Sequence, residues 1–218
     1  MSKIIETPSE IFPALTATTA ESFEALFNKV ERFNWTFSVI VKVYSVLVHS
    51  KTELELYSGL CNSMTSQNGF SLAWIGVPID DDKKSVEILA SAGNARSYLD
   101  GIRVSWGDNK NGNGPAGRAI RTGKIQFFNN MLNSRLFAPW MERAKELNLQ
   151  SSFSLPIKLS TGQVVATLTV YSEQAHAFYK DELKLLDQLN ADLGYCIESL
   201  RSQFPHENAL SMVPNESQ

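Results

Sequence analysis

Cysteine and histidine are scarce in this 218-residue chain, which has two cysteines and three histidines. Cys61 and Cys196 fall among apolar residues in two different predicted helices, so we expect reduced core thiols rather than a disulfide framework or a zinc site. A nucleophile elbow with Ser-His-Asp spacing, an H-E-x-x-H sequence and a Walker A sequence are also missing. General acid–base and nucleophilic catalysis therefore have few residues to use.

Strong charge and long apolar runs are lacking as well. The net charge is −3 and no run of Lys or Arg occurs, so the chain lacks the footprint of a nucleic-acid-binding protein. The N-terminus lacks the charged-then-apolar pattern of a signal peptide. The most apolar run, residues 35–48, contains Lys42 and is shorter than the roughly 20 residues that span a membrane. We therefore expect a cytoplasmic protein without membrane insertion.

A short helix is predicted within GNGPAGRAIRTGKIQFFNN, residues 112–130. Pro115 suits the first position of a helix, and Gly123 suits the left-handed residue that ends one. The glycines match G-x-G-x-x-G, but a polar loop precedes them instead of a strand, so no dinucleotide site is predicted. So short a helix must lie on a surface, here a sheet, and the space beneath it suits a small-molecule pocket.

Two helices carry apolar residues that step alternately by three and four, as in a coiled-coil seam. They are predicted over residues 21–50 and over 180–203. Packing within one chain would also explain the first, because Val39, Val43 and Val46 broaden its apolar face. We expect a homodimer paired through the following residues: Leu26, Val30, Phe33, Phe37, Ile40, Tyr44, Leu47, Leu189, Leu193 and Leu200.

The remaining elements complete an α+β fold. One antiparallel sheet of about five or six strands would have helices on both faces, with the first and last helices together on one face. A capping box of Thr52 and Glu55 opens a helix over residues 51–67, ended by Asn68-Gly69. A further helix is expected over 136–147, and strands over 70–79, 85–92, 125–128, 151–159 and 163–172. The domain would span residues 51–203, between a mobile tail of residues 1–20 and a disordered tail of residues 204–218.

Five segments occur together in one order: GFSLAWIG (69–76), SAGNARSYLDGIRVSWGD (91–108), NGPAGRAIRTGKIQFFNN (113–130), RLFAPWMERAKELNLQSSFSLPIKL (135–159) and VVATLTVYSEQAHAFYKDELKLLDQLNADLGYCIESL (164–200). With these segments, the chain resembles a GAF domain over about residues 50–200. It is most similar to the subtype found as a sensory module in bacterial diguanylate cyclases, cyclic-di-GMP phosphodiesterases and histidine kinases. The resemblance implies a central antiparallel sheet flanked by helices, preceded by a signalling helix that pairs such domains.

The resemblance does not name a ligand or cofactor. Members that bind cyclic nucleotides carry an Asn-Lys-…-Phe-…-Asp-Glu signature, which is absent here. Bilin-binding members and free-methionine sulfoxide reductases use cysteines of the pocket region, where neither Cys61 nor Cys196 falls. Haem binding would need a suitable histidine, and only His176 falls near the rim of the expected sheet.

A ligand pocket is expected between the sheet and its covering helices. By alternation, Leu72 and Trp74 share a face, and Thr167, Thr169 and Tyr171 share another, which leaves open the face that forms the pocket. The candidate ligand-binding residues are Trp74, Trp106, Arg118, Asn129, Phe137, Trp140, Ser154, Thr169 and Tyr171.

Some of these candidates have two interpretations. Arg118, near a helix start, could meet an anion or lie on the surface, and Trp74 and Trp140 could belong to the core or to a ligand cage. Three functions follow: a ligand-responsive sensory module, a dimerisation or partner-binding scaffold with a vestigial pocket, and an enzyme of the GAF type that needs reactive cysteines. The chain ends about 15 residues after the last predicted helix, so we expect any output to come from a separate effector protein.

Overall fold

The computed structural model describes residues 12–66 and 70–203. The helices are α1 (Phe12–His49), α2 (Glu53–Thr65), α3 (Pro115–Thr122), α4 (Met141–Glu146), α5 (Lys180–Asp187) and α6 (Asn190–Gln203). The strands are β1 (Leu72–Pro78), β2 (Val86–Ala92), β3 (Gln126–Phe128), β4 (Ser151–Lys158) and β5 (Val164–Ser172), and the 3₁₀ turns are η1 (Arg96–Leu99), η2 (Met131–Asn133) and η3 (Arg135–Trp140). The chain divides into two compact units, residues 1–38 and residues 39–218.

The second unit is built on one five-stranded sheet, in the order β2-β1-β5-β4-β3, with every pair antiparallel. This confirms the predicted α+β fold with a five- or six-stranded antiparallel sheet. Two neighbouring strands of this sheet, β4 and β5, are buried along nearly their whole length. Such strands are covered on both faces, so their serine and threonine side chains are buried together with the apolar ones.

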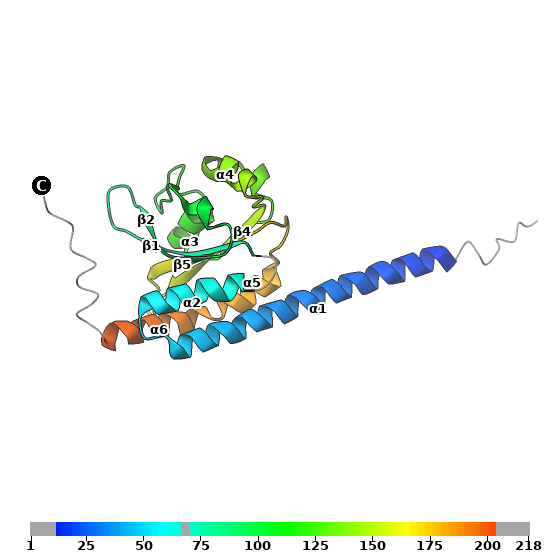
Figure 1. Cartoon of the computed structure of the whole chain (residues 1–218), viewed down its shortest axis with the longest axis horizontal. Helices are drawn as coiled ribbons and strands as arrows, with labels where there is room; N and C mark the ends of the chain where they lie inside the picture. The colour runs from blue at the N-terminus through cyan, green and yellow to red at the C-terminus, as the bar shows by residue number, and fades with distance from the viewer. Residues whose placement is uncertain (1–11, 67–69, 204–218) are drawn as a thin grey trace, which may run out of the picture. The chain divides into compact units, whose positions relative to one another are not determined.

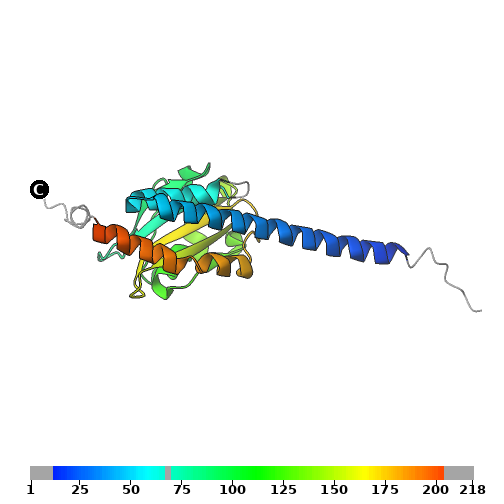
Figure 2. The ribbon, with the colours of Figure 1, turned by 90° about the horizontal axis from the view of Figure 1, so that it is seen from below.

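Helices cover both faces of the sheet. α2 and α6 lie on one face, while α3 and α4 lie on the other (Figure 1). The last turns of α1, within the second unit, pack beside α6 and α2 (Figure 2). There the Tyr44 hydroxyl donates a hydrogen bond of 2.7 Å to Asp192 Oδ2. A Cβ on Gly59 of α2 would come within 2.6 Å of Val46 Cγ1, so these two helices touch where Gly59 has no side chain.

The start of α2 follows the predicted capping box. The Thr52 hydroxyl accepts a hydrogen bond of 3.1 Å from the backbone N–H of Glu55, and the Glu55 carboxylate accepts one of 2.7 Å from the backbone N–H of Lys51. These bonds satisfy amide groups that have no acceptor within the helix.

Two predicted helices need correction in their bounds. α1 begins at Phe12 instead of Glu21, so part of the predicted tail is helical. The helix expected over 136–147 is instead the 3₁₀ turn η3 followed by the short α4, with Pro139 inside the turn, where it has no N–H to bond an earlier carbonyl. The expected tails at residues 1–11 and 204–218, and the helix end at residues 68–69, lie outside the described residues.

The helix expected over 180–203 is two helices, α5 and α6. Asn190, the first residue of α6, uses its side chain at the junction. Its Oδ1 accepts a hydrogen bond of 3.1 Å from the backbone N–H of Lys158, and its Nδ2 donates one of 3.0 Å to Asp187 Oδ1. The break thus allows α6 to bond to the end of β4.

Several residues expected to pair two chains lie elsewhere. Leu193 and Leu200 of α6, and Leu189 just before it, are buried within the single chain. On α1, Ile40 and Leu47 are half-buried. The residues of the expected seam that are exposed are Leu26, Val30, Phe33, Phe37 and Tyr44.

Candidate functional site

A small cavity lies on the α3 side of the sheet, between the strands and the segments that cover them. Its floor comes from β1 and β5, and its walls come from η1, the loop after it, the start of α3, and η3. Ten residues line it: Trp74, Tyr98, Ile102, Val104, Gly114, Pro115, Ala116, Phe137, Trp140 and Tyr171.

Local sequence signals place α3 over this cavity. Pro115 occupies the first position of the helix, and Gly123 ends it with a φ of 60°, as predicted. A Cβ on Gly117 would lie 2.3 Å from the Ser105 carbonyl oxygen, and a Cβ on Gly114 would lie 2.7 Å from Trp140 Cζ3. Glycine at these two positions therefore permits close packing of α3 on its neighbours.

Arg121 holds α3 to the loop before it. Its Nη1 donates hydrogen bonds to the carbonyl oxygens of Trp106, Gly107 and Gly112, at 3.1, 2.7 and 2.8 Å. Its Nη2 donates one of 3.1 Å to Asn113 Oδ1. One guanidinium thus closes the loop over residues 106–113, an arrangement that the sequence did not indicate because the partners are backbone atoms.

The sheet register identifies the face that carries the cavity. In the β1–β5 pair, Leu72 lies opposite Tyr171 and Trp74 lies opposite Thr169. Residues opposite each other point to the same side of a sheet. The two sets of residues whose relative faces were open therefore share one face, and the cavity lies on it.

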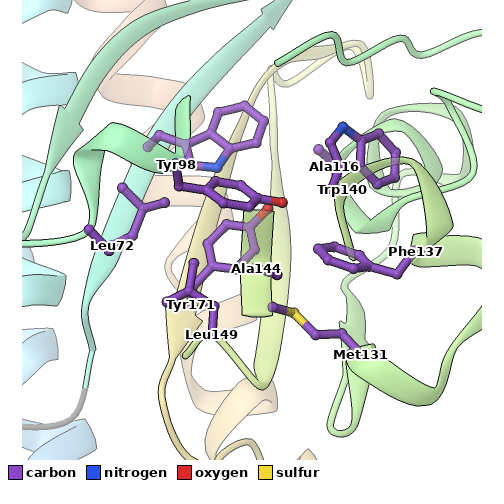
Figure 3. Packing of buried hydrophobic residues seen from close by; sticks show 11 residues of the cluster. Leu72, Tyr98, Ala116, Met131, Phe137, Trp140, Ala144, Leu149 and Tyr171 are labelled. Atoms are coloured by element: carbon purple, nitrogen blue, oxygen red, sulfur yellow. The ribbon is translucent and has the colours of Figure 1, made fainter. Parts of the chain in front are cut away.

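Two tyrosines meet at the cavity floor. The rings of Tyr98 and Tyr171 lie 5.1 Å apart, tilted by 53°, and Figure 3 shows both hydroxyls on the side that faces Phe137 and Trp140. Burial raises the pKa of Tyr171 to about 12 and raises the pKa of Tyr98 well above its ordinary value, an effect that Tyr171 reinforces. Both hydroxyls therefore keep their protons at neutral pH.

Two polar atoms on this face have no hydrogen-bond partner among the described residues. They are Trp74 Nε1 and Ser152 Oγ, both buried. Trp74 Nε1 interacts with the Tyr171 hydroxyl closely enough to lower the pKa of that group, but outside the geometry of a hydrogen bond. Ser152 lies opposite Tyr171 in the β4–β5 pair. Buried polar groups without partners are rare in native structures, which makes both atoms notable.

The outer wall is aromatic. The rings of Phe137 and Trp140 lie 5.5 Å apart, and Trp140 Nε1 donates a hydrogen bond of 3.1 Å to the Arg103 carbonyl oxygen. The empty space of the cavity totals about 240 Å³, partly open to solvent, and the centre of a water molecule could occupy only about 10 Å³ of it. That is about one water's worth of room, well below the volume of a drug-sized pocket.

Four of the nine candidate ligand residues line this cavity: Trp74, Phe137, Trp140 and Tyr171. The sequence did not single out Tyr98, Ile102 and Val104 as pocket residues, because they come from a segment without helical or strand periodicity. The apolar character of these three residues is compatible with a pocket lining, but it is equally compatible with the hydrophobic core.

The other five candidates lie outside the cavity lining. Ser154 and Thr169 are buried on the cavity face and hydrogen-bond to each other at 2.7 Å. Arg118 Nε donates to Gln126 Oε1 at 3.1 Å. The remaining two bond to backbone groups elsewhere: Asn129 to Phe178, and Trp106 through its indole N–H to the Ile79 carbonyl oxygen at 2.8 Å.

Both cysteines lie away from the cavity, on helices of the opposite sheet face. Cys61 of α2 is buried, and burial raises its pKa to about 12. Cys196 of α6 is half-buried, and burial raises its pKa as well. In residues 12–66 and 70–203, no group of three or more His, Cys, Asp or Glu side chains is arranged to hold a metal ion.

An antiparallel sheet with helices on both faces and an aromatic cavity on one side is the architecture of a known class of domain. The chain matches the GAF domain family over residues 50–198, more than half of its length, and so belongs to that family. This confirms the resemblance in the sequence at the level of the family, whose members serve generally as sensory or regulatory domains. No curated protein matches the chain.

Solved structures share the fold at low sequence identity. The GAF domain of A. aeolicus nlh2 in an inactive state is 18% identical, with 77% of this chain and 98% of that chain covered and a TM-score of 0.57. The GAF domain from Acinetobacter phosphoenolpyruvate-protein phosphotransferase is 15% identical, with 82% and 98% covered and a TM-score of 0.58. Free methionine-R-sulfoxide reductase from Neisseria meningitidis, in complex with its substrate, is 15% identical, with 77% and 91% covered and a TM-score of 0.61.

Within the described part of the chain, no helix combines the length and the apolar character needed to cross a bilayer.

Proposed function

We propose that this chain is a non-catalytic sensory module of bacterial signal transduction, of the kind found beside cyclic-di-GMP enzymes and histidine kinases. It binds a small molecule in the cavity beneath α3 and η3, and it signals through a homodimer of its terminal helices to a separate effector protein. The observation that carries this proposal is the aromatic cavity itself, with a buried indole N–H that has no partner among the described residues.

The dimer is supported by the exposed apolar residues of α1. They occur at Leu26, Val30, Phe33, Phe37, Val41, Tyr44 and Val48. Their steps are 4, 3, 4, 4, 3 and 4, so an 11-residue repeat replaces the expected heptads along the second half of the helix. A period of 11 residues over three turns favours nearly straight or slightly right-handed pairing with a second copy.

The positions of the cysteines support a non-catalytic role. Free methionine-R-sulfoxide reductases share this fold, and an enzyme of that type would need thiols within the pocket. The cavity lining includes no cysteine, and the raised pKa values of Cys61 and Cys196 keep both thiols protonated and weakly nucleophilic. Cys61→Ser and Cys196→Ser variants should therefore keep full ligand response.

Native mass spectrometry of the freshly purified protein, with a denaturing spectrum beside it, tests the proposal. A dimer that carries an additional small mass, lost on denaturation, is the expected result. Val41→Glu should shift the dimer to monomer, because it places a charge within the exposed stripe. Ser45→Glu, at an exposed position outside the 4-3-4 spacing, is the matched control and should leave the dimer intact.

The alternative is a dimerisation or partner-binding scaffold with a vestigial pocket, and the small volume of the cavity favours it. A ligand-free dimer whose melting temperature is unchanged across a metabolite panel would select this alternative. A monomer at all concentrations would overturn the signalling dimer in both versions.

A further inference from the structure

The cavity contains a buried hydrogen-bond donor that has no acceptor among the described residues. Trp74 is 1% exposed and its Nε1–H has no hydrogen-bond partner among residues 12–66 and 70–203. An indole nitrogen can only donate, so its requirement is an acceptor atom. The hydroxyls of Tyr98 and Tyr171 stay protonated and lie on the same side of the cavity (Figure 3). One indole N–H, which can only donate, and two hydroxyls, which can donate or accept, therefore meet around one small space.

The rest of the lining is apolar and uncharged. Ile102, Val104, Pro115 and Phe137 supply hydrocarbon surface, and no Lys, Arg, Asp or Glu side chain is among the lining residues. A charged ligand group buried here would find no counter-ion within the lining, because the nearby Arg143 lies outside it and already donates a hydrogen bond of 3.3 Å to the Tyr98 carbonyl oxygen. Burying an unpaired charge is strongly unfavourable. The lining therefore selects against phosphates, carboxylates and ammonium groups.

The dimensions limit the ligand to about one ring. The empty space of about 240 Å³ includes a part that is open to solvent, and the aromatic residues Trp74, Tyr171, Phe137 and Trp140 are among its lining. A planar molecule can lie between aromatic faces with favourable contacts. Some outward movement of the η3 wall is still needed, because only about 10 Å³ is open to the centre of a water-sized sphere.

We propose, on the basis of the sensory function above, that the cavity binds a small, neutral, planar molecule with an apolar body and a hydrogen-bond acceptor, of the aromatic ketone or aldehyde class. Trp74 Nε1–H and the tyrosine hydroxyls donate to the acceptor oxygen, and the aromatic wall covers the ring. By this assignment, Trp74 helps the cavity bind a ligand with an acceptor oxygen more tightly than a hydrocarbon of the same shape.

Three ring compounds of nearly equal shape test this assignment. Acetophenone supplies a neutral ketone, α-methylstyrene replaces its C=O by C=CH₂, and benzoate replaces it by a charged carboxylate. Binding is measured by ligand-observed NMR on the full chain at pH 7. Acetophenone should bind about tenfold more tightly than α-methylstyrene, as expected for one or two net hydrogen bonds, and benzoate should bind more weakly than both.

Trp74→Phe should reduce the preference for acetophenone over α-methylstyrene, because it removes one of the donors, while binding of α-methylstyrene stays about the same. Tyr171→Phe, which deletes one hydroxyl and keeps the ring, gives the same readout if the first variant does not fold. Equal binding of acetophenone and α-methylstyrene by the unmodified protein would overturn the assigned acceptor role, and tighter binding of benzoate would overturn the neutral class.

The two proposals can fail separately. If the protein copurifies with a charged molecule, or is stabilised by one, the sensory function stands and the ligand class is wrong. If neither the three ring compounds nor a metabolite panel binds, and the native mass contains no additional component, both proposals fail and the cavity holds water only.

Discussion

The guanidinium of Arg201, in the last turn of α6, forms a two-point ion pair with the carboxylate of Glu53 at the start of α2. Arg201 Nε lies 2.7 Å from Glu53 Oε1, and Nη2 lies 3.1 Å from Oε2. The Tyr57 hydroxyl donates a further hydrogen bond of 2.8 Å to the same carboxylate. The bond to Glu53 is the main reason that the pKa of Arg201 is raised. This pair joins two helices on the sheet face opposite the cavity.

Replacing Glu53 by Gln should destabilise the domain. The substitution removes a charge-assisted, two-point contact, and because Arg201 is partly exposed we expect a loss of about 1 kcal/mol in the free energy of unfolding. Urea unfolding followed by circular dichroism measures it. The control is Glu142→Gln, which breaks a surface pair with Lys145 and should have a smaller effect. Equal losses in the two variants would show that the Glu53–Arg201 pair stabilises the domain no more than an ordinary surface ion pair does.

Gly194→Ala should also destabilise, against the usual trend for helices. Alanine normally favours a helix over glycine by about 1 kcal/mol. At this position in α6, a Cβ would lie 2.1 Å from the Lys158 carbonyl oxygen, so the helix must move off β4. A net loss of about 2 kcal/mol in unfolding free energy is expected.

Ala191→Gly is the control for this prediction, because Ala191 is exposed in the same helix. It should cost about 1 kcal/mol through helix propensity alone. A stabilised Gly194→Ala variant would contradict the close approach of α6 to β4.

Arg121→Met should loosen the loop over residues 106–113. The change removes donors from three backbone carbonyls while it keeps most of the apolar side chain. Amide hydrogen exchange of Ser105 and Gly112, whose N–H groups bond within this loop, should become at least tenfold faster. Arg118→Met is the matched control on α3, since Arg118 bonds to Gln126 instead. Unchanged exchange in the Arg121 variant would disprove the clamp.

Alkaline pH should lower the free energy of unfolding. Burial raises the pKa of Cys61 and of Tyr171 to about 12 each, above the values of about 8.5 and 10 expected in the unfolded chain. The unfolded state therefore loses these protons first, so the stabilisation is complete below about pH 8 and is lost as the pH rises towards 12.

Urea unfolding at pH 7.5, 9 and 10.5 measures this dependence, and the free energy of unfolding should fall with each step. Cys61→Ala should reduce the slope between pH 9 and 10.5, because one titrating group is removed. Cys196→Ala, at a half-buried thiol, should reduce it less. A free energy that rises with pH would contradict the assigned direction.

Local signals predicted the cavity's roof and part of its floor. Pro115 and Gly123 bound α3 by backbone geometry that depends on residue type alone, so the sequence sufficed. Trp74 and Tyr171 belong to strands with clear apolar character, and their shared face followed once the register was known. Tyr98 was not predicted as a cavity residue, since its position depends on the course of the segment between β2 and α3.

Residues with the same chemistry could not be separated by sequence. Trp106 and Trp140 are both large aromatic residues near the predicted short helix, yet only Trp140 lines the cavity. Trp106 is held elsewhere by the Ile79 carbonyl oxygen and by Lys84, whose Nζ lies 4.7 Å from the ring centre. Likewise, the alternating spacing of three and four residues includes both Leu193, which is buried within one chain, and Val30, which is exposed. The spacing alone therefore does not tell core packing from pairing of two chains.

The central position of β5 has a consequence for how the protein is made. β1 pairs on one side with β2, which follows it directly, and on the other with β5. Leu72 therefore pairs with Tyr171, a residue that is synthesised much later. On the ribosome, the first hairpin therefore emerges with an unpaired edge long before its second neighbour exists. Such delayed pairing of distant segments slows folding and exposes an edge to aggregation. Nascent chains stopped before residue 164 should accordingly depend on chaperones.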